Sequence, residues 1–365
     1  MGGLYLWCGI GGAYYYPRQW QADEVLGFLD RCVEAGATAL LPYFSYFHTG
    51  EPAIIRYDDG QRPYDPSDVL APLDFYTTHG WNPLAFITTE AHARGLMVQP
   101  YTAPGYQGAR QPNWHSPIRE SLPLLTITRF ANDHPEMWSR TQTEEDSLAV
   151  SSYARVSFAF AEARRTERET LCNLATRYDL DGLELEFLRG SGQVSPYGYE
   201  VPAVRSFQER TGRQPAGNND EQWLRHRPRT VDQFVAELHE ALPDDAVLSV
   251  AVTGDPLTAY CWMQDWPTWG RDRLVDAITL RHTTDNPAEI ASQVSAARVA
   301  VGNEVKLVSQ LICWGKGRLQ TADALLAGAQ AALEAGTDAL GVYRADSVEA
   351  LGLWPAVAEI AAFQR

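Results

Sequence analysis

Short apolar runs alternate with helical patterns along the whole chain. The apolar runs, which are rich in residues that favour strands, cover residues 3–9, 37–44, 96–103, 180–188, 247–253, 275–283, 304–313 and 338–344. The helical patterns between and after them cover residues 20–35, 82–94, 160–177, 220–241, 287–300, 321–335 and 354–363. Strands that alternate with helices pair in parallel, so eight such units predict an α/β fold, a single (β/α)₈ barrel of the TIM type.

The connections between the predicted elements differ in length at the two ends of the strands. Helix-to-strand connections are short, as in AGAT at residues 35–38. Strand-to-helix connections are long after the second, third and fourth strands, at residues 45–81, 104–159 and 189–219. Because barrel enzymes build their active sites from strand-to-helix loops, this side is predicted to be catalytic. No linker interrupts the chain, so residues 1–365 are expected to form one domain.

Net charge and composition indicate which classes of binding partner, and which cellular compartment, to expect for this protein. The net charge of −16 argues against nucleic acid or an anionic membrane as a partner. The first residues lack the basic region of a signal peptide, and no stretch approaches the roughly 18 apolar residues of a membrane span. The five cysteines are scattered and form no CxxC pair. We therefore expect reduced thiols in a cytoplasmic protein.

The segment RYDLDGLELEFLRG, residues 177–190, carries the strongest chemical signal. Because side chains alternate along a strand, its leucines are expected to pack against helices while Glu184 and Glu186 point into the barrel. Two inward carboxylates about 6–7 Å apart are costly unless they are paired or used. Glu186 lies nearer the strand end and is predicted to be catalytic. For the deeper Glu184, a structural ion pair with Arg281 is the alternative to direct catalysis.

This segment resembles the fourth strand of glycoside-hydrolase-like barrels of the family 10 type, which read YDVDGIELDF.R. The matching positions are Tyr178, Asp179, Asp181, Gly182, Glu184, Glu186 and Arg189. The resemblance extends upstream to residues 151–165 and downstream to residues 201–215, 265–280 and 335–346. It implies the barrel fold and a hydrolase, a glycosidase that acts on an oligosaccharide or a glycoside.

A glycosidase of this kind needs a second carboxylate. Retaining barrel glycosidases of one large clan carry it at the end of strand seven, where this chain has none. The candidates at other strand ends are Asp285, Asp255 and Asp346, with Glu184 beside them. We favour Asp285, because a nucleophile on strand four with an acid on strand six resembles the α-galactosidase layout. For Asp255 and Asp285, a turn or a helix cap is the alternative role.

Polar and aromatic residues at the strand ends are the candidates for substrate binding. They are Trp7, Tyr43, His48, Tyr101, Arg189, His282, Gln310, Trp314, Arg344 and Asp346. Arg281 and His282 are neighbours on the sixth strand, so only one of them can point inward.

Two other functions remain open. One is a metal-dependent sugar isomerase, epimerase or lyase on the same barrel, and the other is a non-catalytic glycan-binding barrel. The sequence has no HxH or HExxH motif, no P-loop and no complete dinucleotide fingerprint. We therefore expect neither a metal nor a nucleotide cofactor, and a carbohydrate as the substrate.

Overall fold

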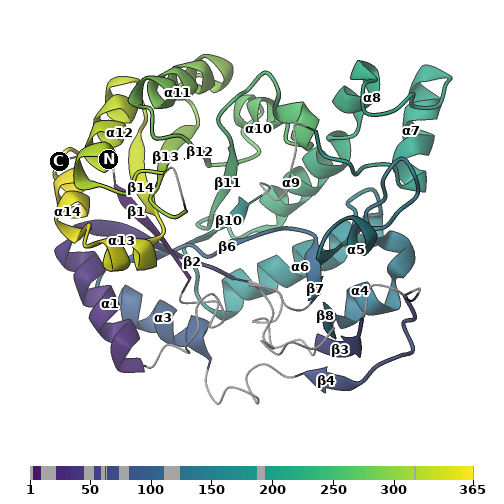
Figure 1. The fold of residues 1–365 in the computed structure, drawn as a ribbon, viewed down its shortest axis with the longest axis horizontal. Helices are drawn as coiled ribbons and strands as arrows, with labels where there is room; N and C mark the ends of the chain where they lie inside the picture. Colours follow the sequence, from purple (N-terminus) through teal and green to yellow (C-terminus); the bar gives the residue numbers. More distant parts are fainter. Residues whose placement is uncertain are drawn as a thin grey trace.

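A curled parallel sheet forms the centre of the molecule (Figure 1). The computed structural model describes residues 3–9, 22–44, 53–58, 62, 64–73, 82–110, 124–186, 194–315 and 318–364. The nine strands of the sheet are β1 (Leu4–Cys8), β2 (Ala37–Pro42), β5 (Met97–Val98), β6 (Tyr101–Thr102), β10 (Gly182–Glu186), β11 (Val247–Thr253), β12 (Ala277–His282), β13 (Lys306–Ile312) and β14 (Ala339–Tyr343). Each of the eight predicted apolar runs holds one or two of these strands.

The pairing order of the sheet is β5-β2-β1-β14-β13-β12-β11-β10-β6, and every pair is parallel. Its two outermost members, β5 and β6, are separated in the chain by Gln99 and Pro100 alone. β5 pairs with β2, whereas β6 pairs with β10. The backbone N–H of Gln99 donates to Leu40 (3.0 Å), and that of Glu184 donates to Pro100 (2.9 Å). One stretch of chain therefore contacts both β2 and β10, which requires the sheet to curl.

Helices pack against the outer face of this sheet. They include α1 (Ala22–Glu34), α3 (Pro83–His92), α6 (Ala161–Arg177), α9 (Arg229–Ala241), α10 (Trp266–Arg271), α11 (Pro287–Val301), α12 (Ala322–Glu334), α13 (Ala345–Leu351) and α14 (Trp354–Ala362). Their apolar residues form the main core with outward-facing strand residues such as Leu183 and Leu185. Among the residues described, none of the helices combines the length and the hydropathy that a membrane crossing requires.

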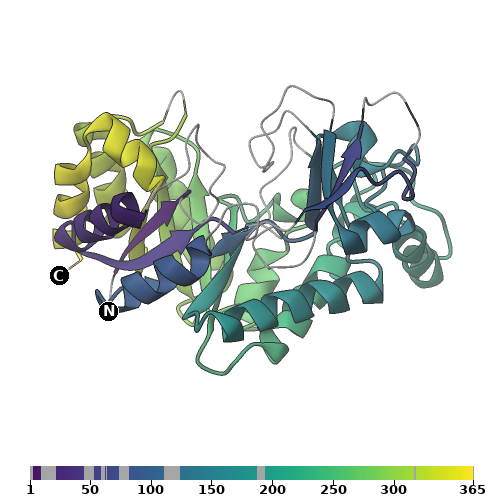
Figure 2. The same ribbon diagram turned by 90° about the horizontal axis from the view of Figure 1, so that it is seen from below.

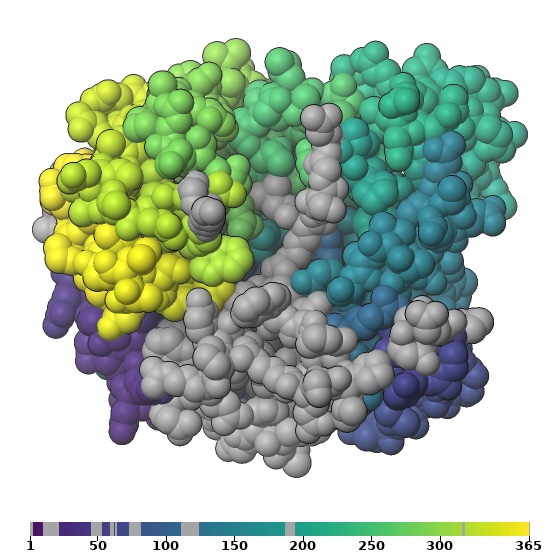
Figure 3. Space-filling model, in the orientation of Figure 1, coloured from purple at the N-terminus to yellow at the C-terminus, as the bar shows by residue number. Residues whose placement is uncertain are grey.

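The helices near the two ends of the chain lie side by side, as the purple and yellow regions of Figure 3 show. The ring centroids of Phe28 in α1 and Trp354 in α14 are 6.2 Å apart. The Nε of Arg31 in α1 lies 2.9 Å from a carboxylate oxygen of Glu349 in α13. These contacts join the first helix to the last ones around the same sheet.

The helix predicted over residues 220–241 is divided in two. α8 (Glu221–His226) ends before Pro228, and α9 begins after it. Proline has no backbone N–H and clashes with the preceding turn, so the helical pattern cannot continue through it. A further helix, α7 (Val201–Thr211), lies in the segment 189–219 that we predicted as a loop.

A second, antiparallel sheet occupies the other two segments that were predicted as long loops. Its order is β4-β3-β8-β7-β9, and its strands are β3 (Ala53–Tyr57), β4 (Ala71–Leu73), β7 (Tyr106–Arg110), β8 (Leu124–Thr128) and β9 (Tyr153–Arg155). With α4 (Arg129–Asp133), η2 (Pro135–Met137) and α5 (Ser147–Val150), it encloses its own apolar core, which includes Ile54, Ile127 and Trp138. Figure 2 shows this sheet at the opposite end of the molecule from the chain termini.

A buried carboxyl group connects the second sheet to α6. The Oε1 of Glu167 accepts a hydrogen bond from the backbone N–H of Gly105 (3.0 Å), and its Oε2 accepts one from Gln107 Nε2 (2.9 Å). Gln107 Oε1 in turn accepts from the hydroxyl of Thr128 (2.9 Å). Glu167 is fully buried, and this burial raises its pKa from 4.5 to about 8. The folded protein therefore holds this carboxyl group in its neutral form at pH 7.

The variant Glu167→Gln tests this assignment through the pH dependence of stability. Between about pH 4.5 and pH 8, the folded wild type keeps a proton that the unfolded chain has released. The free energy of unfolding should therefore fall as the pH rises, by up to about 1.4 kcal/mol per pH unit from this group. An amide cannot titrate, so urea unfolding at pH 5, 6, 7 and 8 should give a flatter profile for Glu167→Gln.

The matched control is Glu169→Gln, because Glu169 is an exposed glutamate on the same helix. Its exposed pair with Arg165 contributes little to stability, so the wild-type pH profile should be retained. Equal slopes for wild type and Glu167→Gln would contradict a neutral Glu167 in the folded state.

Candidate active site

The inner face of the curled sheet is lined by aromatic and small apolar side chains around two carboxylates. The apolar cluster on this face comprises Tyr5, Trp7, Ala39, Leu41, Tyr43, Tyr101, Ala277, Val308, Ile312, Ala339 and Tyr343. Leu183 and Leu185 of β10 belong to the outer core, so the residues that alternate with them, Glu184 and Glu186, point to the inner face.

Glu184 lies in the interior and is surrounded by hydrogen-bond donors. Trp7 Nε1 donates to its Oε1 (2.5 Å), while the hydroxyls of Thr279 (2.7 Å) and Ser249 (3.3 Å) donate to its Oε2. Trp7 lies on β1, which is not a neighbour of β10 in the sheet, so this contact crosses the inner face. Burial raises the pKa of Glu184 to about 7, although the bonds from Thr279 and Trp7 oppose the rise. Near neutral pH this group therefore exchanges a proton.

Glu186 lies one inward position nearer the strand ends and is 4% exposed. Arg281 Nη1 donates to its Oε1 in a salt bridge. The ion pair of Arg281 with Glu184, given above as the alternative role of Glu184, is not formed, because Arg281 pairs with Glu186 instead. Thr279, two residues before Arg281 on β12, contacts Glu184, so Arg281 reaches the carboxylate nearer the strand ends. An arginine that donates to a carboxylate stabilises its charged form.

Aromatic rings form a continuous row from the interior to the rim of this face. Tyr101 lies 5.2 Å from Tyr43 and 6.2 Å from Tyr343 between ring centroids, and Trp314 lies 6.3 Å from Tyr343. Tyr101 is 1% exposed whereas Trp314 is 45% exposed. The Arg281 guanidinium lies 4.7 Å from the centroid of the Tyr343 ring, so the row also contacts the partner of Glu186.

Arg344 and Asp346 extend the site beside Trp314. The Arg344 guanidinium is 5.9 Å from the Trp314 ring centroid, and its Nε donates to both carboxylate oxygens of Asp346 (2.7 and 2.9 Å). Burial acts to lower the pKa of Arg344, but the bonds and charge of Asp346 raise it above its ordinary value. The predicted residues Trp314, Arg344 and Asp346 therefore lie together, next to the aromatic row.

His282 lies on the outer face of the sheet, under α11. Its Nδ1 is 2.7 Å from Gln293 Oε1, and its Nε2 is 3.1 Å from the hydroxyl of Ser309. Burial lowers its pKa to about 4. Because Arg281 occupies the inward position, the expectation that His282 contacts substrate is not supported by its placement. Gln310 points inward and is 2% exposed, and its Oε1 has no hydrogen-bond partner in the described part of the chain.

The two aspartates favoured as second carboxylates lie on exposed turns. Asp255 accepts hydrogen bonds from the backbone N–H of Leu257 (2.9 Å) and the hydroxyl of Thr258 (2.5 Å), which is the turn role given above as the alternative. Asp285 is exposed and directly precedes Asn286, the residue that caps α11. Two further predicted residues, His48 and Arg189, lie outside the described residues.

Ser249 and Thr279 contact Glu184 but were not among the predicted site residues. Both are polar residues at inward positions, each between two apolar residues of its strand, and this interruption of the apolar pattern is the signal that could have identified them. Within the described ranges, no three His, Cys, Asp or Glu side chains are grouped so that they could hold a metal ion.

Comparisons with known proteins identify a family of glycosyl hydrolase-like proteins. The family model described as "Glycosyl hydrolase-like 10" matches residues 67–326, more than half of the chain. No curated protein sequence matches at a significant level.

Solved structures with a similar fold include domains of glycoside hydrolases. The glycoside hydrolase domain of PgaB (BpsB) from Bordetella bronchiseptica is 15% identical, with 99% of each chain covered and a TM-score of 0.63. The catalytic domain of β-amylase from Paenibacillus polymyxa is 11% identical, with 100% of each chain covered and a TM-score of 0.64. An α-galactosidase from Geobacillus stearothermophilus in complex with raffinose is 9% identical, with 99% of this chain and 41% of that chain covered and a TM-score of 0.53.

Proposed function

Since this chain belongs to the glycosyl hydrolase-like 10 family, we propose that it hydrolyses a glycosidic bond of an oligosaccharide or a glycoside at the inner face of its curled sheet. One observation carries the proposal: Glu184 and Glu186, side by side on β10, have contrasting environments. Burial raises the pKa of Glu184 to about 7, whereas Glu186 is paired with Arg281. Glu186 is therefore a carboxylate next to a cation at the strand end, above a carboxyl group that titrates near neutral pH, and a reactive carboxylate at this place is what glycoside hydrolysis requires.

Glu186 is the group that acts on the sugar, as nucleophile or base, because it lies nearest the strand ends. Arg281 donates to this carboxylate, and the Arg281 guanidinium itself lies 4.7 Å from the centroid of the Tyr343 ring. Glu184 lies beneath it and adjusts the local charge through its own proton. The acid that protonates the leaving oxygen stays a prediction, with Asp285 favoured over Asp255 and Asp346.

We also infer that the sheet closes into a single (β/α)₈ barrel, in which β5 and β6 act as one strand. The pairing of β5 with β2 and of β6 with β10 supports this closure. The contacts of Trp7 with Glu184 and of Tyr101 with Tyr343 support it further, because both cross the inner face. That residues 1–365 form one domain, and that the protein is cytoplasmic, stay predictions.

Release of reducing sugar from a panel of neutral oligosaccharides tests the proposed function. Maltohexaose, cellohexaose, xylohexaose and stachyose cover several linkages, and we expect hydrolysis of at least one of them. Activity should survive treatment with EDTA, since carboxyl groups alone can perform glycoside hydrolysis. Activity that disappeared with EDTA and returned with a divalent ion would favour the metal-dependent alternative instead. No hydrolysis of any panel member would count against the proposal.

A further inference from the structure

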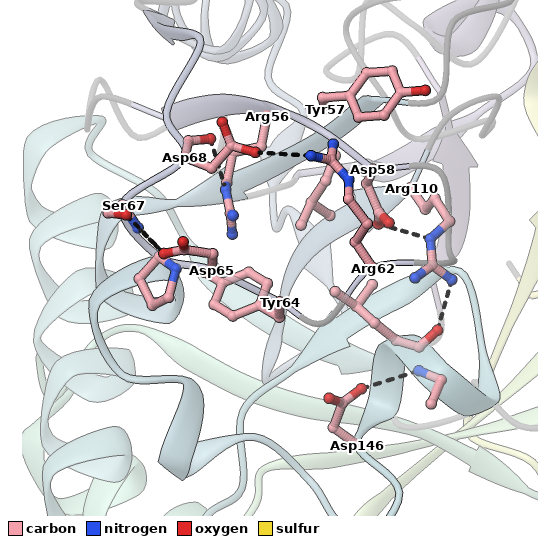
Figure 4. Close-up of a pocket in the computed structure, with 14 residues that line it drawn as sticks. Arg56, Tyr57, Asp58, Arg62, Tyr64, Asp65, Ser67, Asp68, Arg110 and Asp146 are labelled. Carbon is pink, nitrogen blue, oxygen red and sulfur yellow. Dashed lines mark hydrogen bonds and ion pairs between the residues drawn. The ribbon is translucent and has the colours of Figure 1, made fainter.

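A cavity of about 1060 Å³ lies on the second sheet (Figure 4). It is lined by residues of β3, β7, β8 and α5, by Asp146 and by residues 58, 62 and 64–68. None of these lining residues belongs to a strand of the parallel sheet. Its volume is at the upper end of the range for small-molecule sites, about 300–1,000 Å³, and so suits a ligand larger than one sugar ring.

The polar lining combines both charges with aromatic rings. Among the described lining residues there are three arginines, four aspartates, two tyrosines and one serine, so the formal charge of these residues is three minus four, or −1. Arg110 Nε is 2.7 Å from Asp58 Oδ2, and Arg62 lies 4.0 Å from Asp68. Because these two cations already face carboxylates, the cavity is poorly suited to a phosphate or another polyanion. It instead places donors and acceptors next to one another, as a ligand rich in hydroxyl groups requires.

Arg56 and Tyr64 form the inner wall of the cavity. The Arg56 guanidinium lies 4.2 Å from the Tyr64 ring centroid, and its Nε donates to the carbonyl of Asp68 (3.1 Å). The Tyr64 hydroxyl donates to Asn132 Oδ1 (2.9 Å), which fixes the ring. Arg56 is 3% exposed, and its Nη1 has no hydrogen-bond partner in the part of the chain that is described. The Arg56 guanidinium and the Tyr64 ring therefore form a stacked wall of a cation and an aromatic ring.

Tyr57 and Arg62 form the outer rim. The Tyr57 side chain is 41% exposed, and Arg62 Cζ lies 4.7 Å from its ring centroid. The rim therefore offers an aromatic surface beside polar planar groups, which matches the alternating C–H and hydroxyl surfaces of a sugar. We propose that this cavity is a second, non-catalytic site for a neutral oligosaccharide. It would hold a part of the glycan remote from the bond that is cut. The choice of a glycan rests on the proposed function.

Hydrogen exchange and calorimetry on the Glu186→Gln variant, in which turnover is suppressed, test this proposal. Each of maltohexaose, cellohexaose, xylohexaose and stachyose is added separately, with hexagalacturonic acid as the acidic counterpart. We expect at least one neutral sugar to slow exchange in residues 53–57 and 64–70. Adding Tyr57→Ala should weaken that binding about tenfold or more, since tyrosine is a frequent binding hot spot.

Tyr260→Ala is the matched control. Tyr260 also lies under an arginine, Arg225, at 4.4 Å from Cζ to ring centroid, but it does not line the cavity. Its substitution should leave protection of residues 53–57 unchanged. Three results would each overturn the second site. They are protection by hexagalacturonic acid alone, no protection by any of the sugars, and sugar binding that is unchanged by Tyr57→Ala. If the wild type hydrolyses a sugar but no sugar protects the cavity, the second site is wrong and the proposed function stands. If a sugar protects the cavity but none is hydrolysed, the proposed function is wrong and the second site stands.

Discussion

Glu186→Gln is expected to lower kcat by at least about a hundredfold on any substrate that the wild type hydrolyses. General acid–base or nucleophilic roles contribute about 10²–10⁴-fold in rate, and an amide can perform neither. The amide keeps the shape of the side chain and an oxygen that can accept the bond from Arg281, so the protein should fold and bind sugar. Steady-state kinetics, circular dichroism and sugar-binding measurements on the same preparation separate lost chemistry from lost structure.

Glu184→Gln is the companion variant, because its side chain lies two residues away on the same strand. The wild-type rate should show an inflection near pH 7, where Glu184 loses its proton beneath Glu186. The amide still accepts the bond from Trp7 but does not titrate, so this inflection should disappear while turnover is retained. A near wild-type rate for Glu186→Gln would show that the chemistry lies elsewhere. A collapse of turnover in Glu184→Gln alone would transfer the reactive role to Glu184.

The parallel sheet and the inward carboxylates could be predicted because both depend on local periodicity. Each strand of the central sheet is an apolar run bounded by turn residues, and alternation along β10 places Glu184 and Glu186 on the inner face. The fourth-strand motif also indicated the right group of proteins, since the family match confirms the resemblance to glycoside-hydrolase-like barrels.

The second sheet could not be predicted from local patterns. Its strands are three to five residues long, and Ile54 of β3 pairs with Ile127 of β8 across a long stretch of chain. Such pairing is fixed by packing between distant segments rather than by the sequence of either strand. The partner of Arg281 was missed for a related reason. The alternation of side chains along a strand determines which face of the sheet a side chain is on. It does not determine which residue of another strand lies opposite that side chain, here Glu184 or Glu186.

Gly341→Ala should strongly destabilise the inner face of the parallel sheet. A Cβ at Gly341 would lie 2.3 Å from Cζ3 of Trp7 and 2.7 Å from the backbone oxygen of Tyr5. Both distances are far below van der Waals contact, and inserting atoms into a packed interior costs about 1–3 kcal/mol or more. Because Trp7 donates to Glu184, a displaced indole would also remove one of the bonds that hold this carboxyl group.

Urea unfolding of Gly341→Ala should therefore show a free energy of unfolding about 3 kcal/mol below that of the wild type. Gly27→Ala is the control. Gly27 lies within α1, where the nearest atom to a new Cβ is 3.7 Å away, and alanine favours the helix by up to about 1 kcal/mol. Adding Trp7→Phe to Gly341→Ala should recover only part of the loss, because the backbone oxygen of Tyr5 remains in place. An unchanged free energy of unfolding for Gly341→Ala would mean that Trp7 does not pack against β14. The Trp7 indole would then have to approach Glu184 from a different position.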